Sequence, residues 1–109
     1  MSIYYYVRCE FDDEALRQAF VAWLVKGEHV REVCEPAGGR AEVVPLDGSP
    51  PRLEVRYEFP SREAFADYER DHAPRLREEG RSRFPGGVKM ERATGRPLHL
   101  EEKKAEEKA

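Results

Sequence analysis

The sequence has no asparagine, a single glutamine (Gln18) and only two cysteines, Cys9 and Cys34. Two cysteines are too few for the disulfide framework of a small secreted domain, although one bridge between them stays open. We expect both to be reduced thiols that pack as small apolar side chains. No apolar run approaches the ~18 residues of a membrane span, and the first residues, MSIYYYVRCEF, lack the basic and apolar regions of a secretory signal. We therefore expect a soluble, cytoplasmic protein with no membrane partner.

Motifs for metals, nucleotides and acyl transfer are missing as well. His29, His72 and His99 show no ligand spacing with one another or with either cysteine, so we predict no metal site. The chain contains no GxGxxG, no GxxxxGK[ST] and no GxSxG. We expect no cofactor, and a haem held through one axial histidine is the alternative left open.

Charge of one sign is not in excess. The 109 residues include 19 Lys and Arg against 22 Asp and Glu, for a net charge of −3. This balance predicts a mixed-charge surface rather than one that attracts phosphates, so we expect no nucleic-acid partner. The length suits one domain. We assign it to residues 1–97 and interpret residues 98–109, which end in EEKKAEEKA, as a charged, disordered tail.

Four segments have the composition or period of β-strands. Residues 3–9, IYYYVRC, are rich in aromatic and β-branched types, and residues 52–59, RLEVRYEF, alternate between apolar and charged side chains. Residues 40–46 form a further expected strand, joined to 52–59 by a turn, and residues 88–93 form the last one. On the 52–59 strand the apolar face carries Leu53, Val55, Tyr57 and Phe59, and the other face carries Arg52, Glu54, Arg56 and Glu58.

The first helical segment begins at Asp12 and Asp13, which offer an N-cap and a first-turn negative charge. Gly27 ends or breaks it, and a second short helical piece with His29 near its start continues to Pro36. The apolar stripe of the first piece is Leu16, Phe20, Trp23 and Leu24.

A second helix is predicted after Ser61, a plausible N-cap. Pro74 lacks an amide hydrogen and would clash with the carbonyl four residues back, so the helix must kink there or restart with Pro74 at its first position. Its apolar stripe is Phe65, Tyr68, His72 and Leu76.

The resulting order, βαββαβ, predicts an α+β, ferredoxin-like fold: a four-stranded antiparallel sheet with two helices on one face. The other face carries Tyr4, Tyr6 and Arg8 beside the alternating charges of 52–59. That face could meet water or bind RNA, but the aromatic RNA-binding signature is missing. We favour a homodimer through this open face, with arginines meeting glutamates of the partner and tyrosine burial supplying most of the affinity.

The segment after Tyr68 carries the most specific pattern, YxxxHAPxLRxE followed by a later Arg-Phe. Together with the helix that contains Trp23 and the GEHVREV segment, it resembles a family of small bacterial proteins of unknown function with a dimeric α+β barrel fold. The resemblance covers about residues 3–94; where the family tends to have isoleucine and proline after the first histidine, this chain has Val30 and Arg31. It implies a barrel and a dimer but no activity, and similar barrels include cofactor-free oxygenases, haem-degrading enzymes and small isomerases or dehydratases. The matching residues are Tyr68, His72, Ala73, Pro74, Leu76, Arg77, Glu79, Arg83 and Phe84.

His72 and Tyr68 are the candidate catalytic pair, because an imidazole on the apolar stripe can act as an acid or base beside a phenol. The remaining candidates would line a site for a small apolar or aromatic ligand: Tyr57, Trp23, His29 and Phe65. Each of these side chains could instead be part of the core. The function therefore stays open between ligand binding, a cofactor-independent oxygenase or isomerase, and a non-catalytic interaction or regulatory module.

Five arginines between residues 70 and 83 could hold an anion, but the acidic residues among them favour a solvated surface.

Overall fold

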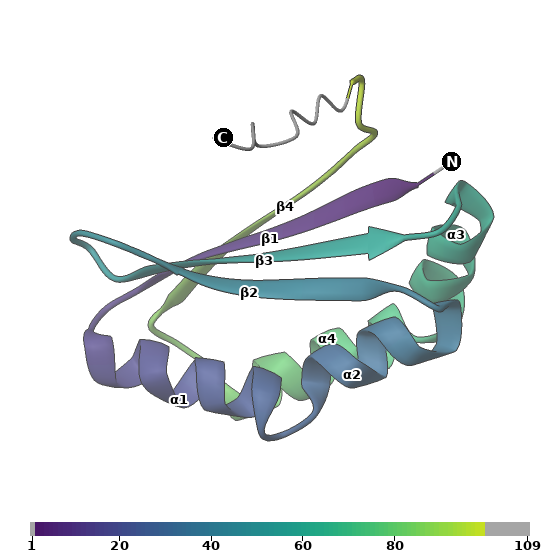
Figure 1. Cartoon of the computed structure of the whole chain (residues 1–109). Coiled ribbons are helices and arrows are strands. Elements are labelled where there is room, and N and C mark those ends of the chain that lie inside the picture. The colour runs from purple at the N-terminus through teal and green to yellow at the C-terminus, as the bar shows by residue number, and fades with distance from the viewer. Residues whose placement is uncertain (1, 100–109) are drawn as a thin grey trace, which may run out of the picture.

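The computed structural model describes residues 2–99, so the tail expected over 98–109 lies almost wholly outside the described residues. The chain folds as βαββαβ, and each of the two helical connections is divided into shorter segments (Figure 1). In chain order the elements are β1 (Ile3–Phe11), α1 (Glu14–Val25), α2 (His29–Cys34), the 3-10 helix η1 (Glu35–Ala37), β2 (Arg40–Leu46), β3 (Arg52–Phe59), α3 (Arg62–Asp71), α4 (Ala73–Arg83) and β4 (Val88–Gly95).

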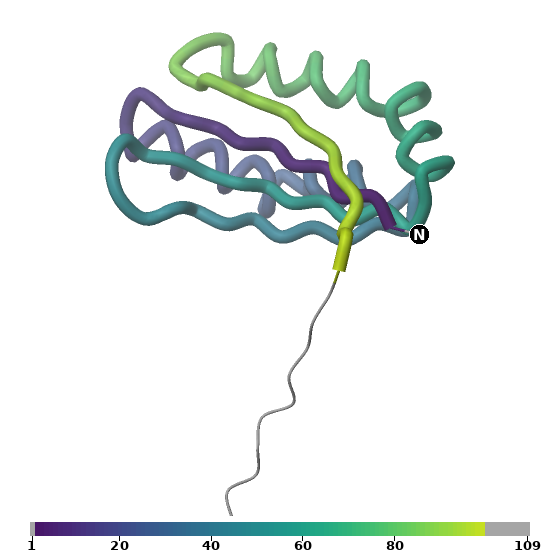
Figure 2. The backbone as a smooth tube through the Cα atoms, turned by 90° about the horizontal axis from the view of Figure 1, so that it is seen from above, coloured from purple at the N-terminus to yellow at the C-terminus, as the bar shows by residue number. Residues whose placement is uncertain are grey.

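The four strands form one antiparallel sheet in the order β2-β3-β1-β4. This order is the ferredoxin-like topology, so the predicted fold class is confirmed. Tyr5 lies opposite Tyr57 and Val7 opposite Val55, which places the apolar side chains of both central strands on one face. Figure 2 looks onto the other face, with α1 behind the sheet and α4 near the β4 edge.

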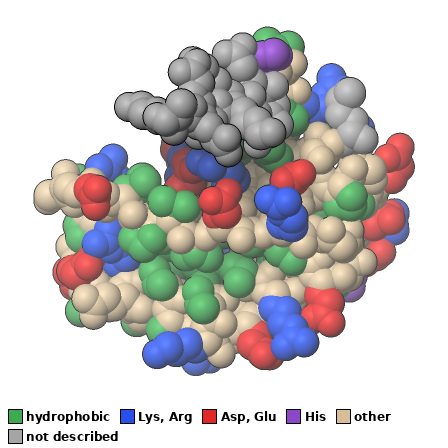
Figure 3. Space-filling view, in the orientation of Figure 1, with side chains coloured by type: hydrophobic (Ala, Val, Ile, Leu, Met, Phe, Trp, Pro, Cys, Tyr) green, Lys and Arg blue, Asp and Glu red, His purple; other side chains and the backbone are tan. Residues whose placement is uncertain are grey.

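The core lies between the sheet and the helices. Along β3 every second residue is buried, as the alternation of 52–59 predicts, and Leu53 and Phe59 have no exposed surface. The helices contribute Val33 and Leu76, which are almost completely buried. Over the face seen in Figure 3, positive and negative side chains are interspersed around a group of hydrophobic ones, consistent with the predicted mixed-charge surface.

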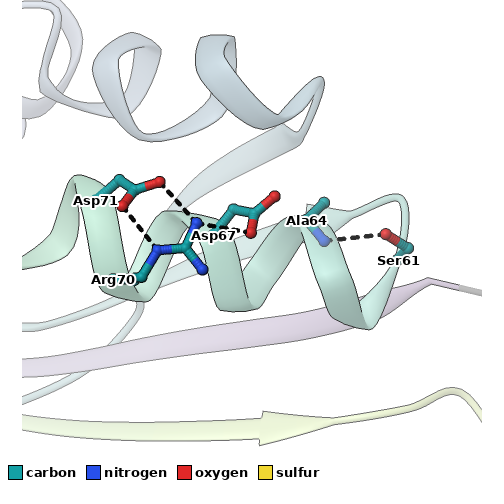
Figure 4. Close-up of polar contacts among 5 residues, drawn as sticks. All are labelled: Ser61, Ala64, Asp67, Arg70 and Asp71. Atoms are coloured by element: carbon teal, nitrogen blue, oxygen red, sulfur yellow. Dashed lines mark hydrogen bonds and ion pairs between the residues drawn. The ribbon is translucent and has the colours of Figure 1, made fainter.

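Side-chain caps fix where two of the helices begin. The backbone amide of Leu16 donates to Asp13 Oδ1 at 2.8 Å at the start of α1. At the start of α3 the amide of Ala64 donates to Ser61 Oγ at 3.0 Å (Figure 4). Both residues satisfy an amide that has no partner within the helix, as their positions in the sequence predict.

Gly27 separates α1 from α2. A Cβ at this position would lie 2.5 Å from the carbonyl oxygen of Trp23, so only glycine fits there. The next residue, Glu28, has a φ of 64°, in the left-handed region. This reversal ends α1 and brings His29, the first residue of α2, back onto the ring of Trp23.

Pro74 divides the second helical connection. α3 ends at Asp71, His72 has a non-helical φ of −126°, and α4 restarts at Ala73 with Pro74 in its first turn. Of the two predicted outcomes the structure shows the restart, with Pro74 one position later than expected. The lost amide falls where a helix has unpaired amides anyway. Figure 2 shows the resulting corner between α3 and α4.

The cysteines are both free. Burial raises the pKa of each thiol to about 11, so both are protonated near neutral pH and inert as nucleophiles. Among residues 2–99, no helix has the length and apolar character needed to cross a membrane.

Replacing the α3 cap tests its contribution to stability. Ser61→Ala should lower the free energy of unfolding by about 1 kcal/mol, because the amide of Ala64 loses its acceptor. Urea denaturation followed by circular dichroism measures this change. Ser82→Ala, within the exposed part of α4, is the matched control and should change stability by less than about 0.5 kcal/mol. Equal effects of the two substitutions would contradict the capping role.

Candidate functional site

A cavity of about 290 Å³ lies between the helices and the sheet. Its walls come from β1, β3 and β4 on the sheet side and from all four α-helices on the other. Most of the wall is apolar, and a few polar side chains interrupt it, which is the usual composition of a small-molecule site. The main apolar contributors are Val7, Phe20, Leu24, Val55, Leu76 and Phe84.

Trp23 and His29 form one part of the wall. Their rings are stacked, with centroids 4.0 Å apart and planes inclined by 27°. Gly80 of α4 leaves room for the indole, because a Cβ there would lie 3.3 Å from it. His29 Nδ1 is buried and has no hydrogen-bond partner among the described residues. One polar ring nitrogen in the cavity wall is therefore left without a hydrogen-bond partner in the described part of the chain.

Burial of His29 lowers its pKa from 6.5 to about 4. Glu79 opposes this effect and Arg75 adds to it, but both contribute less than the loss of solvent. The imidazole is therefore neutral at pH 7, with one ring nitrogen as donor and the other as acceptor.

Three tyrosines from different elements also line the cavity. The rings of Tyr5 and Tyr57 are stacked with centroids 5.6 Å apart. The ring centroid of Tyr68 lies 6.2 Å from that of Tyr5. Burial raises the pKa of Tyr57 and of Tyr68 well above the ordinary value of 10. Both phenols keep their protons at physiological pH and can donate a hydrogen bond.

The structure brings together four of the six residues singled out in the sequence. The same cavity is lined by Trp23, His29, Tyr57 and Tyr68. Phe65 packs behind it, with ring centroids 5.3 Å from Tyr5 and 5.2 Å from Phe59.

His72 lies at the junction of α3 and α4 and is half-buried. It is not among the described residues that line the cavity. Its helical phase was predicted on the assumption that the helix breaks at Pro74, whereas the helix is already interrupted at His72. Its catalytic role stays a prediction.

Three arginines that the sequence interpretation did not assign to the site also line the cavity. Arg77 and Arg81 come from α4 and Arg92 from β4, whereas no Asp or Glu among the described residues lines it. A signal for Arg92 was present in the sequence, because in 88–93 it shares one strand face with Val88 and Met90. Identifying it required knowing that this face borders α4.

Metal binding has no support among residues 2–99, where no three His, Cys, Asp or Glu side chains gather closely enough to hold an ion.

The open face of the sheet is the second surface of interest. Glu54 accepts hydrogen bonds from Arg8 at 3.0 Å and from Arg56 at 2.7 Å, and both guanidinium groups lie within 6 Å of the Tyr6 ring. Burial opposes ionisation of Glu54, but these arginines outweigh it and its pKa is lowered. Glu54 is therefore already paired within one chain.

No family model and no curated protein sequence matches the chain. Solved structures do resemble it. A dimeric ferredoxin-like protein from an uncultured marine organism has a TM-score of 0.68 at 13% identity, over 93% of this chain and 99% of that one. SnoaB, a cofactor-independent oxygenase from Streptomyces nogalater, has a TM-score of 0.66 at 8% identity, over 91% and 95%. An ethyl tert-butyl ether D (EthD) family protein from Bacillus halodurans has a TM-score of 0.65 at 16% identity, over 90% and 100%.

These likenesses establish the ferredoxin-like α+β fold. They also fit the resemblance to a small-protein family of unknown function with that fold. At such low identity they carry no activity to this chain.

The lowered pKa of His29 makes stability depend on pH. As the pH falls below 6.5, the unfolded chain protonates His29, whereas the folded chain does so only near pH 4. The free energy of unfolding should therefore decrease as the pH is lowered from 6.5 to 4. The full difference corresponds to at most about 3 kcal/mol, because His29 retains some solvent contact. Urea denaturation between pH 7 and 4 should show a shallower decline for His29→Phe than for the parent. An NMR titration midpoint near 6.5 for the His29 ring would contradict the burial effect.

Proposed function

We propose that the protein is a homodimer, formed through the open sheet face, that binds a small apolar or aromatic molecule in the cavity. The observation that carries this proposal is the cavity itself, with its apolar wall and its few convergent polar groups. A cavity of ~150 Å³ can hold benzene, so 290 Å³ is enough for one or two rings. Trp23 and the tyrosines offer flat surfaces for such rings.

The protonation states in the cavity favour binding over acid–base chemistry. An efficient general acid or base has a pKa near the operating pH. His29 has a pKa of about 4, and the pKa values of Tyr57 and Tyr68 are raised above 10. These groups orient a molecule by hydrogen bonding better than they transfer its protons.

The open face supports the dimer. Tyr4 and Tyr6 lie there half-buried, with ring centroids 6.3 Å apart, and no described helix covers them (Figure 1). Because Glu54 already has two arginine partners, covering this face would bury paired rather than isolated charges. A structural neighbour with the same fold is described as dimeric. The two free thiols suit a reducing compartment, so we place the protein in the cytoplasm.

A cofactor-independent oxygenase or isomerase is the second candidate, with His72 and Tyr68 in catalytic roles. The observation that favours it is the likeness to SnoaB together with a Tyr68 that lines the cavity. It requires His72 to reach the bound molecule by a rearrangement at the α3–α4 junction. A non-catalytic interaction module gives no reason for a cavity between the sheet and the helices.

Removing a tyrosine from the open face tests the dimer. Tyr6→Ser should weaken self-association at least ~10-fold, because aromatic rings dominate the affinity of such faces. Sedimentation velocity measures the change, and Arg70→Ser, on the outer surface of α3 (Figure 4), is the control that should leave the dimer intact. Circular dichroism confirms that both variants are folded. A monomeric parent protein would remove the dimer from the proposal.

Filling the cavity tests ligand binding. Small molecules that co-purify with the parent protein are identified by mass spectrometry of a denatured extract. Val7→Phe, which places a ring in the cavity, should reduce their retention at least ~10-fold, because the added ring occupies the binding volume. Val25→Phe adds the same ring to a 53% exposed site and should retain them.

If Val7→Phe and Val25→Phe retain the co-purifying molecules equally, these molecules bind outside the cavity. The same measurement on His72→Gln separates the two candidates, since only the enzyme hypothesis requires His72 for retention or turnover.

A further inference from the structure

The charged side chains of the cavity all have the same sign. Arg77, Arg81 and Arg92 line it, and none of the described residues that line it is acidic. The protein as a whole carries a net charge of −3, so this local excess does not follow from its composition. A cavity wall with several positive charges and low-dielectric surroundings concentrates anions.

Arg77 is held in place with a donor still unused. Its Nη2 donates to Glu69 Oε2 at 2.8 Å and to the Tyr5 hydroxyl at 3.3 Å. Its Nε is buried and has no acceptor among the described residues. A buried donor without an acceptor is costly, and because Nε itself has almost no accessible surface, an anion in the cavity would bind the part of the guanidinium that lines it.

Arg92 reaches the cavity from the opposite wall. It lies opposite Val7 in the β1–β4 ladder, so it shares the helix-side face of the sheet with Val7. No ion pair or hydrogen bond joins its side chain to another residue of the range 2–99. Arg81 is bound by Glu78 at 2.6 Å and its side chain is 66% exposed, whereas the side chain of Arg77 is only 30% exposed. Arg77, the most buried of the three, and Arg92, which is exposed at the sheet edge and has no ion pair in the described range, are therefore the two arginines on which the inference rests.

We infer that the molecule in the cavity is an aromatic carboxylate, with its ring against the apolar wall and its carboxylate bound by Arg77 and Arg92. This inference rests on the proposed ligand-binding function and names the chemical class of its ligand. The guanidinium fork matches the geometry of a carboxylate and forms charge-assisted hydrogen bonds with it. A neutral aromatic would leave Arg92 without an anionic partner and Arg77 with Glu69 alone, and a small inorganic anion would leave the apolar wall in contact with water.

Binding of 2-naphthoate and of its neutral amide, 2-naphthamide, tests the inference by isothermal titration calorimetry. The two probes have nearly the same shape and differ in charge. The parent protein should prefer the naphthoate by ~10-fold or more, because only the carboxylate forms charge-assisted bonds. Added salt should weaken naphthoate binding and leave naphthamide binding nearly unchanged.

Arg92→Gln should remove most of the preference for naphthoate over naphthamide. It should lower the affinity for naphthoate ~10-fold and change the affinity for naphthamide by less than ~2-fold. Lys89→Gln is the matched control, since it removes one positive charge from the same strand. Lys89 lies opposite Glu10 on the other face of the sheet, and this variant should keep the parent's preference. Arg77→Gln is a less clean variant because Arg77 also binds Glu69 and Tyr5.

Equal affinities of the parent protein for the two probes would overturn the carboxylate assignment and leave the cavity as a binding site for neutral aromatics. A preference that persists in both Arg92→Gln and Arg77→Gln would overturn the role of these arginines. Failure of both probes to bind, together with equal retention by Val7→Phe and Val25→Phe, would overturn the ligand-binding function itself.

Discussion

The pairing of β1 with β3 places Tyr5, Val7 and Cys9 of β1 on the same face of the sheet as the apolar side chains of β3. Because side chains alternate along a strand, a slip of one residue would move Tyr57 and its neighbours to the opposite face and expose the core. The same pairing places Glu54 between Arg8 and Arg56 on the other side. One register thus defines both surfaces on which the functional proposals depend: a buried aromatic layer that faces the helices and a polar layer that faces outward.

The cavity follows from how the helices cover that layer. β4 lies at the sheet edge and is mostly exposed along its length, and it offers Val88, Met90 and Arg92 to the helix side, none of them aromatic. On α4, Gly80 provides no side chain where the helix approaches Trp23. The cavity therefore lies where the helices meet a lightly packed strand at the edge of the sheet.

The fold could be predicted closely from the sequence because its signals are local. The strands at 40–46 and 52–59 and the caps at Asp13 and Ser61 have the predicted positions. β1 and β4 extend two residues further than predicted because ladder pairing continues, a non-local effect. The site was less predictable. The inward orientation of His72 assumed that the helix continues through His72 up to the predicted break at Pro74. His29 reaches Trp23 only through the reversal at Gly27 and Glu28, and Arg92 depends on which helix lies beside β4.

The stack of Trp23 on His29 gives the molecule a built-in optical reporter. Trp23 is the only tryptophan in the chain, so red-edge excitation selects an indole in the cavity wall and no other. Its emission responds to the polarity of its surroundings and to the charge of the imidazole against which it lies. Entry of the proposed ligand into the cavity should therefore change the emission of the native protein without any added label.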